Sequence, residues 1–170
     1  DDELLDALEG PLDLDAFLSF WAAETLTSHW DGYAGNTNNF YFYEDPTSGQ
    51  VHFIPWGTDG TFVPPIMLFE GLPAPRSINA AGLLARRLYL HPEGQAMYLE
   101  RLTSLLDTHW DAGVLQESID SMEEVFWPGL PASYIEYVQD GLAETESFVS
   151  SHGDLIRAEL EGGPEPWTTP

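Results

Sequence analysis

Two short segments of this chain are strong β-strand candidates, and they constrain the fold more than any other feature. Residues 40–43 (Phe-Tyr-Phe-Tyr) and 51–54 (Val-His-Phe-Ile) are rich in the aromatic and β-branched residues that favour strands. Between them lies a segment with Pro46 and Gly49, which predicts a hairpin with its turn at 46–49. The sheet is thereby limited to one hairpin, so the rest of the domain must be built from helices.

Helical periodicity accounts for most of the remaining chain. Apolar residues recur at helical spacing over six segments: 4–8, 13–28, 78–90, 92–110, 112–126 and 131–160. Asp13 and Asp111 suit helix caps, and Pro92 suits a first helical turn. The predicted fold class is therefore a mainly helical α+β domain with one small β-hairpin. We expect one domain over residues 1–163, with an irregular Pro-rich segment from 64 to 75 and a frayed tail over 164–170.

The charge of the chain restricts its partners. The formal net charge is −24, and the only Lys or Arg residues are five arginines. Such a surface repels nucleic acid and anionic lipid, so the expected macromolecular partners are basic proteins. Cysteine is absent, which excludes thiol chemistry, and no apolar run approaches the ~18 residues of a membrane span.

The most unusual segment lies between the second predicted helix and the hairpin. It runs His29-Trp30-Asp31-Gly32-Tyr33-Ala34-Gly35-Asn36, with Asp31 two residues after His29 and Asn36 five residues after Asp31. This is the spacing of the protein-kinase catalytic loop, H-R-D-x-x-x-x-N. Asp59-Gly60 follows the hairpin, where a kinase has the Asp-Phe-Gly aspartate that binds magnesium. The order of these elements is that of a kinase C-terminal lobe.

Phosphoryl transfer explains why these residue types would be needed. One carboxylate must orient the attacking hydroxyl and accept its proton, while another carboxylate and an amide oxygen hold a divalent metal against the phosphate oxygens. Asp31, Asp59 and a loop asparagine would supply these groups. Taken singly, Asp31 also fits a capping or turn residue, and Asp59-Gly60 also fits a simple turn, so the functional interpretation depends on their combination.

Three stretches around these residues resemble the CotH family of spore-coat-type atypical protein kinases. They are Trp30–Tyr33, Asn38–Asp45 and Phe53–Asp59, and the resemblance is most specific over about residues 28–62. The resemblance implies an atypical protein-kinase-like C-lobe, ATP and Mg²⁺ or Mn²⁺ as cofactors, and phosphoryl transfer to Ser or Thr of a protein. It also implies an extracellular location or one at the cell or spore surface.

The resemblance assigns roles by position. Asp31 matches the catalytic aspartate, and Asp59 matches the metal-binding aspartate. Two asparagines stay open as the further metal ligand: Asn36 fits general kinase spacing, and Asn39 matches the residue before the family's aromatic strand and is slightly favoured. His29 would orient the loop, or it would simply end a helix at the solvent edge. Many family members read Pro-Trp-Asp-x-Asp, whereas position 57 is Gly here, which leaves the number of bound metals open.

The resemblance also implies a second lobe. The family's nucleotide site needs an N-terminal lobe with a phosphate-binding loop and a cationic phosphate ligand, and neither occurs before residue 12. We therefore expect the chain to be the C-terminal part of a kinase, inactive or nearly so alone, and its nucleotide-binding residues are unassigned. The expected partners are the missing lobe and a basic Ser-containing protein substrate, which the negative field would attract.

Two other functions fit parts of the same pattern. A pseudokinase-like surface module would keep the fold and bind a basic protein without catalysis, as Gly57 and the missing lobe suggest. A carbohydrate-active domain would use the same Trp, Tyr, Asp and Asn residues, but it requires a pair of carboxylates facing an open aromatic cleft.

Overall fold

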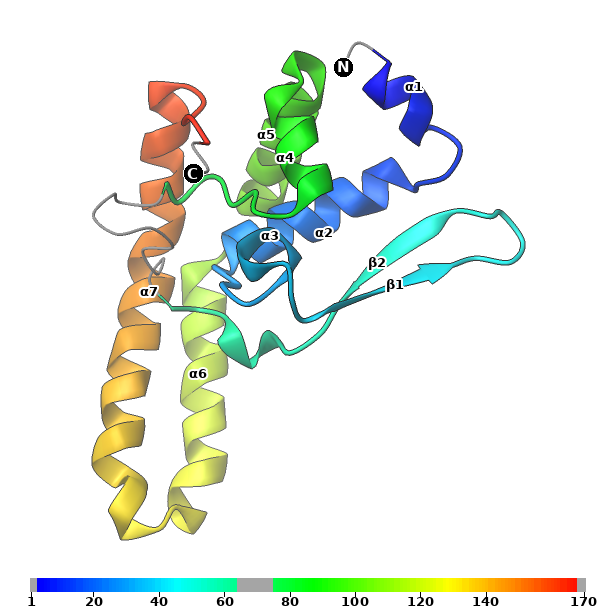
Figure 1. The fold of residues 1–170 in the computed structure, drawn as a ribbon. Coiled ribbons are helices and arrows are strands. Elements are labelled where there is room, and N and C mark those ends of the chain that lie inside the picture. Colours follow the sequence, from blue (N-terminus) through cyan, green and yellow to red (C-terminus); the bar gives the residue numbers. More distant parts are fainter. Residues whose placement is uncertain (1–2, 64–74, 168–170) are drawn as a thin grey trace.

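The computed structural model describes residues 3–63 and 75–167 and confirms a mainly helical α+β fold (Figure 1). The seven α-helices of this described part are α1 (Leu4–Leu8), α2 (Leu14–Leu26), α3 (Tyr33–Asn36), α4 (Leu83–Leu90), α5 (Pro92–His109), α6 (Ala112–Phe126) and α7 (Ile135–Gly162). Three 3₁₀ turns accompany them: η1 (Thr58–Gly60), η2 (Trp127–Gly129) and η3 (Ala132–Tyr134). The Pro-rich stretch predicted at 64–75 lies almost wholly outside the described residues.

One antiparallel hairpin forms the sheet of the described chain. Strand β1 (Phe40–Glu44) pairs with β2 (Val51–Pro55), with Phe42 opposite Phe53. In the turn, the Asp45 carboxylate accepts hydrogen bonds from the Thr47 amide at 2.8 Å and the Ser48 hydroxyl at 3.1 Å. The predicted hairpin and its turn are therefore confirmed. The short polar side chain of Asp45 stabilises the turn by accepting hydrogen bonds that the turning backbone leaves unmade.

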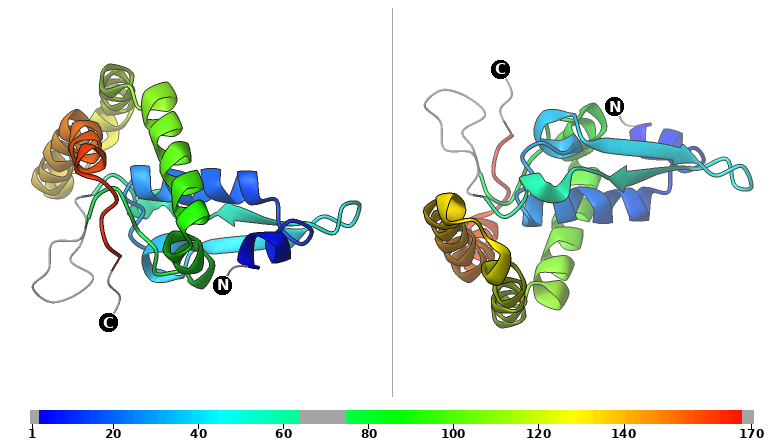
Figure 2. Two further views of the ribbon diagram at one scale, coloured as in Figure 1. Left: turned by 90° about the horizontal axis from the view of Figure 1, so that it is seen from above. Right: turned by 90° about the horizontal axis from the view of Figure 1, so that it is seen from below.

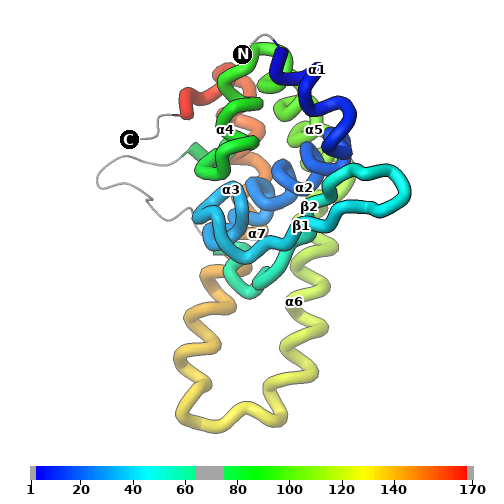
Figure 3. Tube along the Cα trace, turned by 45° about the vertical axis from the view of Figure 1, so that its right-hand side comes forward, coloured from blue at the N-terminus to red at the C-terminus, as the bar shows by residue number. Residues whose placement is uncertain are grey.

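The elements form three regions in space (Figure 1 and Figure 2). Helices α2, α4 and α5 pack together at the centre, since α5 contacts both α2 and α4. The hairpin extends to one side of α2, and its strand β2 contacts that helix. Helix α6 and the first part of α7 form an antiparallel pair that projects away from the other helices, as the trace in Figure 3 also shows, whereas the C-terminal part of α7 lies beside the central helices and places Ile156 in the core.

Side-chain caps explain why three helices begin where they do. Asp13 accepts from the Ala16 amide at 3.0 Å and begins α2, and Asp111 accepts from the Gly113 amide at 2.9 Å and begins α6. His91 accepts from the Gly94 amide at 3.2 Å beside Pro92, the first residue of α5. Each cap satisfies an amide that has no partner inside its helix.

The helix predicted from residue 78 begins only at Leu83. Long-range hydrogen bonds hold the preceding segment in an irregular path: the Glu159 carboxylate accepts from the Ser77 amide at 2.8 Å, and Ala81 N donates to Ala34 O at 2.8 Å. Ile78 and Ala80 are nevertheless buried in the core. Helical spacing alone could not reveal that tertiary partners would use these amides.

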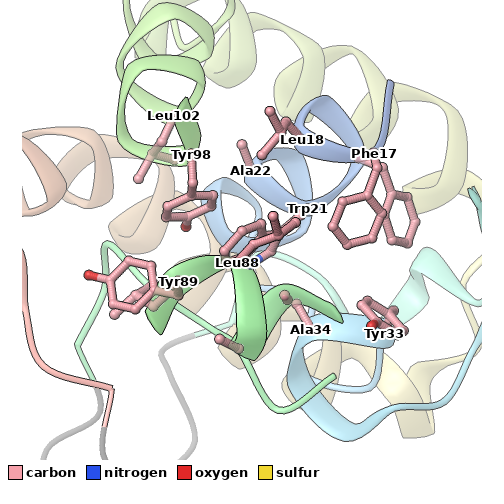
Figure 4. Packing of buried hydrophobic residues seen from close by; sticks show 14 of the residues in the cluster. Phe17, Leu18, Trp21, Ala22, Tyr33, Ala34, Leu88, Tyr89, Tyr98 and Leu102 are labelled. Carbon is pink, nitrogen blue, oxygen red and sulfur yellow. The ribbon is translucent and has the colours of Figure 1, made fainter. Parts of the chain in front are cut away.

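The hydrophobic core lies between α2, α4 and α5 (Figure 4). Trp21 stacks on Tyr98 with ring centroids 3.8 Å apart, and both are completely buried. Their polar atoms are satisfied, because Trp21 Nε1 donates to Asn79 O at 2.6 Å and the Tyr98 hydroxyl donates to Ser77 O at 2.9 Å. Large buried rings with paired polar atoms make this contact a rigid support for the loop that follows α2.

The α6–α7 pair is less buried than the helical pattern predicts. Met122 lies at helical spacing from the apolar residues Leu115 and Ile119, yet it is 63% exposed, because α7 covers only one side of α6. Leu83, at helical spacing from Leu84 and Leu88 on α4, is likewise 61% exposed. Of the tail predicted to fray, residues 164–167 are described, and the Tyr89 hydroxyl donates to Glu165 O at 2.7 Å. None of the described helices is long and apolar enough to span a membrane.

Candidate active site

The candidate site is built on the loop between α2 and β1. The chain leaves α2 sharply, with Ser28 in the left-handed region at φ 51°, and His29 N donates to Glu24 O at 2.8 Å. The short helix α3 interrupts the predicted loop, and Thr37 and Asn39 again have positive φ values of 54° and 43°. This tightly wound path brings several polar side chains of the loop to one place.

Three asparagine side chains converge on the Asp31 carboxylate. Asn36 Nδ2 donates to Asp31 Oδ1 at 2.7 Å, and Asn39 Nδ2 donates to Asp31 Oδ2 at 2.6 Å. Asn38 Nδ2 lies 3.4 Å from both oxygens. Asp31 is half-buried, so these bonds set the orientation of its carboxylate while leaving it accessible to solvent. Asn36 and Asn39, the two predicted metal ligands, thus both lie beside Asp31.

Glu24, on helix α2, anchors the Asp31 loop, a role that was not predicted from the sequence. It is buried in α2, and its carboxylate accepts from the Tyr33 amide at 3.0 Å and from the Ala34 amide at 2.7 Å. Burial raises the pKa of Glu24 to about 7, although these two hydrogen bonds lower it. A sequence signal did exist, because Glu24 is a charged residue within the apolar run of a core helix.

His29 connects this loop to the segment after the hairpin. Its ring is 1% exposed, Nε2 lies 3.1 Å from Gly57 O, and Nδ1 lies 3.6 Å from Glu24 Oε1. A carbonyl only accepts, so Nε2 carries the proton in this contact. The burial contradicts the alternative of a histidine at the solvent edge and agrees with the position expected of a loop-orienting residue.

The segment that carries Asp59 packs directly against the Asp31 loop. Trp56 N donates to Asn39 O at 3.1 Å. A Cβ added to Gly57 would lie 2.8 Å from Asn39 Cγ, and one added to Gly60 would lie 3.1 Å from Trp30 Nε1. The sequence-predicted Asp31, Asn39 and Asp59 thus belong to segments that the fold brings into contact.

Asp59 itself lies in η1 and is exposed. Its carboxylate has no side-chain hydrogen bond or ion pair with any other residue of the described part of the chain. An unpaired carboxylate can bind a cation without first breaking an ion pair or a hydrogen bond to another side chain.

The donor chemistry fits Mg²⁺ or Mn²⁺. Two carboxylates and amide oxygens are hard ligands, and Mg²⁺ often uses one or two carboxylates and keeps several waters. Asn36 and Asn39 use their amide nitrogens toward Asp31, which leaves their Oδ1 atoms available. Within residues 3–63 and 75–167 no group of three or more His, Cys, Asp or Glu is placed to hold a metal, so an ion here would also need the amide oxygens, water or phosphate.

Large exposed side chains lie beside the site on the hairpin and just after it. Trp56 is 59% exposed and lies edge-on to Tyr41, with ring centroids 5.4 Å apart. Tyr41, Ile54 and Trp56 share one face of the hairpin, because side chains alternate along a strand and Tyr41 pairs with Ile54. All three are exposed, and we call this surface the outer hairpin face.

A cavity of about 450 Å³ lies between α2 and β2, next to the buried side of the Asp31 loop. Its walls include Phe20, Phe53 and Phe62, together with the polar residues Glu24 and His29. The cavity therefore reaches the two buried groups that hold the Asp31 loop, but not Asp31 or Asp59.

The match to a known protein family covers nearly the whole chain. A family model described as CotH kinase protein matches residues 1–155 of the 170. A search of curated proteins finds no match. The family match includes the Asp31 loop, the hairpin, the Asp59 segment and most of α7.

Proposed function

This chain belongs to the CotH kinase family, and from that premise we propose that it transfers the γ-phosphoryl group of ATP to a Ser or Thr hydroxyl of a protein with the help of Mg²⁺ or Mn²⁺. One observation supports this function above others. Asp31 and Asp59 lie on two segments that pack together through His29, Gly57 and Asn39. Phosphoryl transfer depends on positioning and charge stabilisation, which such a rigid joint can provide.

Asp31 is the proposed catalytic base. Its carboxylate would accept a hydrogen bond from the substrate hydroxyl and take its proton as the oxygen attacks the γ-phosphorus. The amides of Asn36 and Asn39 already hold its two oxygens from one side, so the direction in which the carboxylate receives the hydroxyl is preset. Preorganisation of this kind reduces the reorganisation needed during the reaction.

Asp59 is the proposed metal ligand, with the Oδ1 atom of Asn39 or Asn36 as its partner. A bound divalent ion would neutralise charge on the phosphate oxygens of ATP. Asp59 is exposed and unpaired among the described residues, which suits this role. At position 57, Gly replaces a carboxylate common in the family and leaves room for the Asn39 side chain, so we propose that Asn39 is the more important asparagine.

The outer hairpin face supports a second, nucleotide-binding lobe as a partner of this domain. Tyr41, Ile54 and Trp56 expose large apolar groups beside the Asp59 segment, with fractional exposures of 55%, 45% and 59%. Aromatic surface of this kind is typical of a face that another element covers. We propose that the lobe supplies the cation that binds phosphate, because two of the arginines, Arg101 and Arg157, bond to Ser19 and Asp154, away from Asp31 and Asp59.

The charge of the chain supports a basic protein substrate. A formal charge of −24 attracts Lys- and Arg-rich segments around a target serine and raises their encounter rate. An extracellular, cell-surface or spore-surface location is proposed from the family alone.

The decisive experiment measures transfer of labelled γ-phosphate from ATP and Mg²⁺ or Mn²⁺ to a Ser-bearing, Arg- and Lys-rich peptide. It compares the full protein with its Asp59→Ala and Asp31→Asn variants, and with Asp140→Ala as a matched control, since Asp140 is an exposed aspartate on α7. We expect transfer in the wild type and the control, and a loss on the order of 1,000-fold or more in the two site variants.

The same experiment identifies the alternative. If the folded full protein neither transfers phosphate nor binds ATP in a metal-dependent way, phosphoryl transfer is wrong. Binding of a basic protein that is unchanged by Asp59→Ala would then favour a non-catalytic surface module.

A further inference from the structure

The side of α6 that faces away from α7 is a second surface with a distinct chemistry. Val114, Met122 and Val125 are 57%, 63% and 81% exposed. With the small residues Ser118 and Ser121 they line a shallow, open concavity on the surface of α6. We call these five residues the outer face of α6. From Val114 to Val125 the face extends about 17 Å along the helix, roughly three turns.

The position of this face follows from how α6 packs. Helix α6 contacts α7, and on that side Gln116 Nε2 lies 3.3 Å from Glu146 Oε1. Leu115 and Ile119 are partly covered, whereas the residues of the outer face point elsewhere on the helix. Helix α6 and the first part of α7 also project from the rest of the molecule, so the outer side of α6 is accessible (Figure 1 and Figure 3).

Carboxylates border the outer face, and the stretch of sequence around it contains no positively charged residue that would neutralise them. Glu117 and Glu124, seven residues apart, lie along the edge of the face on a helical wheel, and Glu117 also lines the concavity. Residues 112–147 contain no Lys, Arg or His. They contain eight acidic residues: Glu117, Asp120, Glu123, Glu124, Glu136, Asp140, Glu144 and Glu146.

This combination selects one kind of occupant. Exposed apolar side chains favour a partner that buries them, and the surrounding carboxylates favour Lys or Arg at the edge of that partner. A second copy of this chain fits less well, because each copy carries −24 charges and would place like charges around the contact.

We propose that the outer face of α6 is a docking site for a basic amphipathic helix of a partner protein. The partner's apolar residues would pack against Met122, Val114 and Val125, above the small Ser118 and Ser121, and its Lys or Arg side chains would pair with Glu117 and Glu124. The proposal does not depend on phosphoryl transfer, since the surface lies outside the contacts of Asp31 and Asp59 and its test contains no ATP.

The probe is an 18-residue peptide with Leu along one helical face and Lys along the other. Its control is a scrambled peptide of the same composition, in which Leu and Lys are no longer segregated. Isothermal titration calorimetry at physiological ionic strength measures the affinity of the chain for both. We expect the amphipathic peptide to bind at least tenfold more tightly than the scrambled peptide.

Two variants separate the apolar and charged contributions. Met122→Ser combined with Val125→Ser should weaken binding about tenfold through lost apolar burial. Glu117→Gln combined with Glu124→Gln should weaken it severalfold and reduce its dependence on salt. All four positions are at the surface, so the variants should keep the fold, which circular dichroism checks.

Matched controls lie on other helices. Glu93→Gln with Glu100→Gln removes two exposed carboxylates at the same seven-residue spacing on α5, and Leu90→Ser removes a 69% exposed leucine on α4. These controls should bind like the wild type. Equal binding of the scrambled peptide, or equal losses in the control variants, would overturn the proposal and attribute the affinity to net charge.

Discussion

The buried ring of His29 donates from Nε2 to the carbonyl oxygen of Gly57 at 3.1 Å. Together with the bond from Trp56 N to Asn39 O, this bond joins the loop that carries Asp31 to the segment that carries Asp59, although His29 and Gly57 are 28 positions apart. The other ring nitrogen faces the Glu24 carboxylate, so the joint is also tied to helix α2. The relative position of the two proposed site aspartates therefore depends on groups that would not touch the substrate.

Replacing His29 should reduce activity through this joint. His29→Ala leaves the Gly57 carbonyl without its donor, and we expect phosphoryl transfer to fall on the order of 100-fold because the two segments lose their register. His29→Gln keeps an N–H donor and should recover part of the rate. His109→Ala, at an exposed histidine, should have no effect. A rate for His29→Ala equal to that of the wild type would show that the joint does not position the site.

The two asparagines bonded to Asp31 should contribute unequally. Asn39 is half-buried and contacts both Asp31 and the Gly57 segment, whereas Asn36 is exposed and its bond competes with water. We expect Asn39→Ala to lower kcat roughly tenfold more than Asn36→Ala. Measuring the Mn²⁺ concentration dependence of both variants identifies the metal ligand, and a larger effect at Asn36 would reverse the assignment.

Gly57 and Gly49 form a natural pair for testing a close contact. Both have positive φ values, 61° and 74°, but an added Cβ meets the Asn39 side chain at position 57 and open space at position 49. Ala at either position carries the cost of a left-handed backbone, about 1 kcal/mol. Gly57→Ala should lower the free energy of unfolding, measured with urea, by at least a further ~1 kcal/mol and weaken the Asn39–Asp31 bond. Equal costs at the two positions would contradict the contact.

Glu24 should make the stability of the domain depend on pH. Its pKa is raised from 4.5 to about 7, so the folded state binds its proton more tightly than the unfolded state does. Its contribution is therefore complete below pH 4.5 and is lost as the pH rises to about 7, a loss on the order of 3 kcal/mol.

The check is urea unfolding followed by tryptophan fluorescence from pH 4 to 8. Glu24→Gln cannot titrate and should remove this part of the pH dependence, while the exposed Glu100→Gln should retain it. A pH profile of Glu24→Gln that is parallel to the wild type would disprove the role of Glu24.

Glu159 should stabilise the irregular segment before α4. Its carboxylate accepts from the Arg76 amide at 2.8 Å and the Ser77 amide at 2.8 Å, more than 80 positions away in sequence. Glu159→Ala should lower the free energy of unfolding by about 1–3 kcal/mol and speed hydrogen exchange of these amides. Glu161→Ala, at an exposed glutamate two residues later, should change neither quantity.

The local elements and the residue types of the candidate site can be predicted from the amino-acid sequence. The β-hairpin over 40–55 and the caps at Asp13 and Asp111 follow from short-range chemistry, since each depends on residues within a few positions of one another. The spacing of His29, Asp31 and Asn36 is that of a kinase catalytic loop, and the stretches Trp30–Tyr33, Asn38–Asp45 and Phe53–Asp59 resemble the family that matches the chain.

The groups that hold the site together, and the surfaces that stay exposed, follow instead from contacts between distant segments. The position of Glu24 in an apolar run hints at a special role, but only the fold shows that the role is to bind the Tyr33 and Ala34 amides. Met122 reads as a core residue until the fold shows that α7 covers the other side of α6. The physical reason is the same in both cases: helical periodicity predicts which side chains share a face, but burial and hydrogen-bond partners depend on contacts between segments distant in sequence.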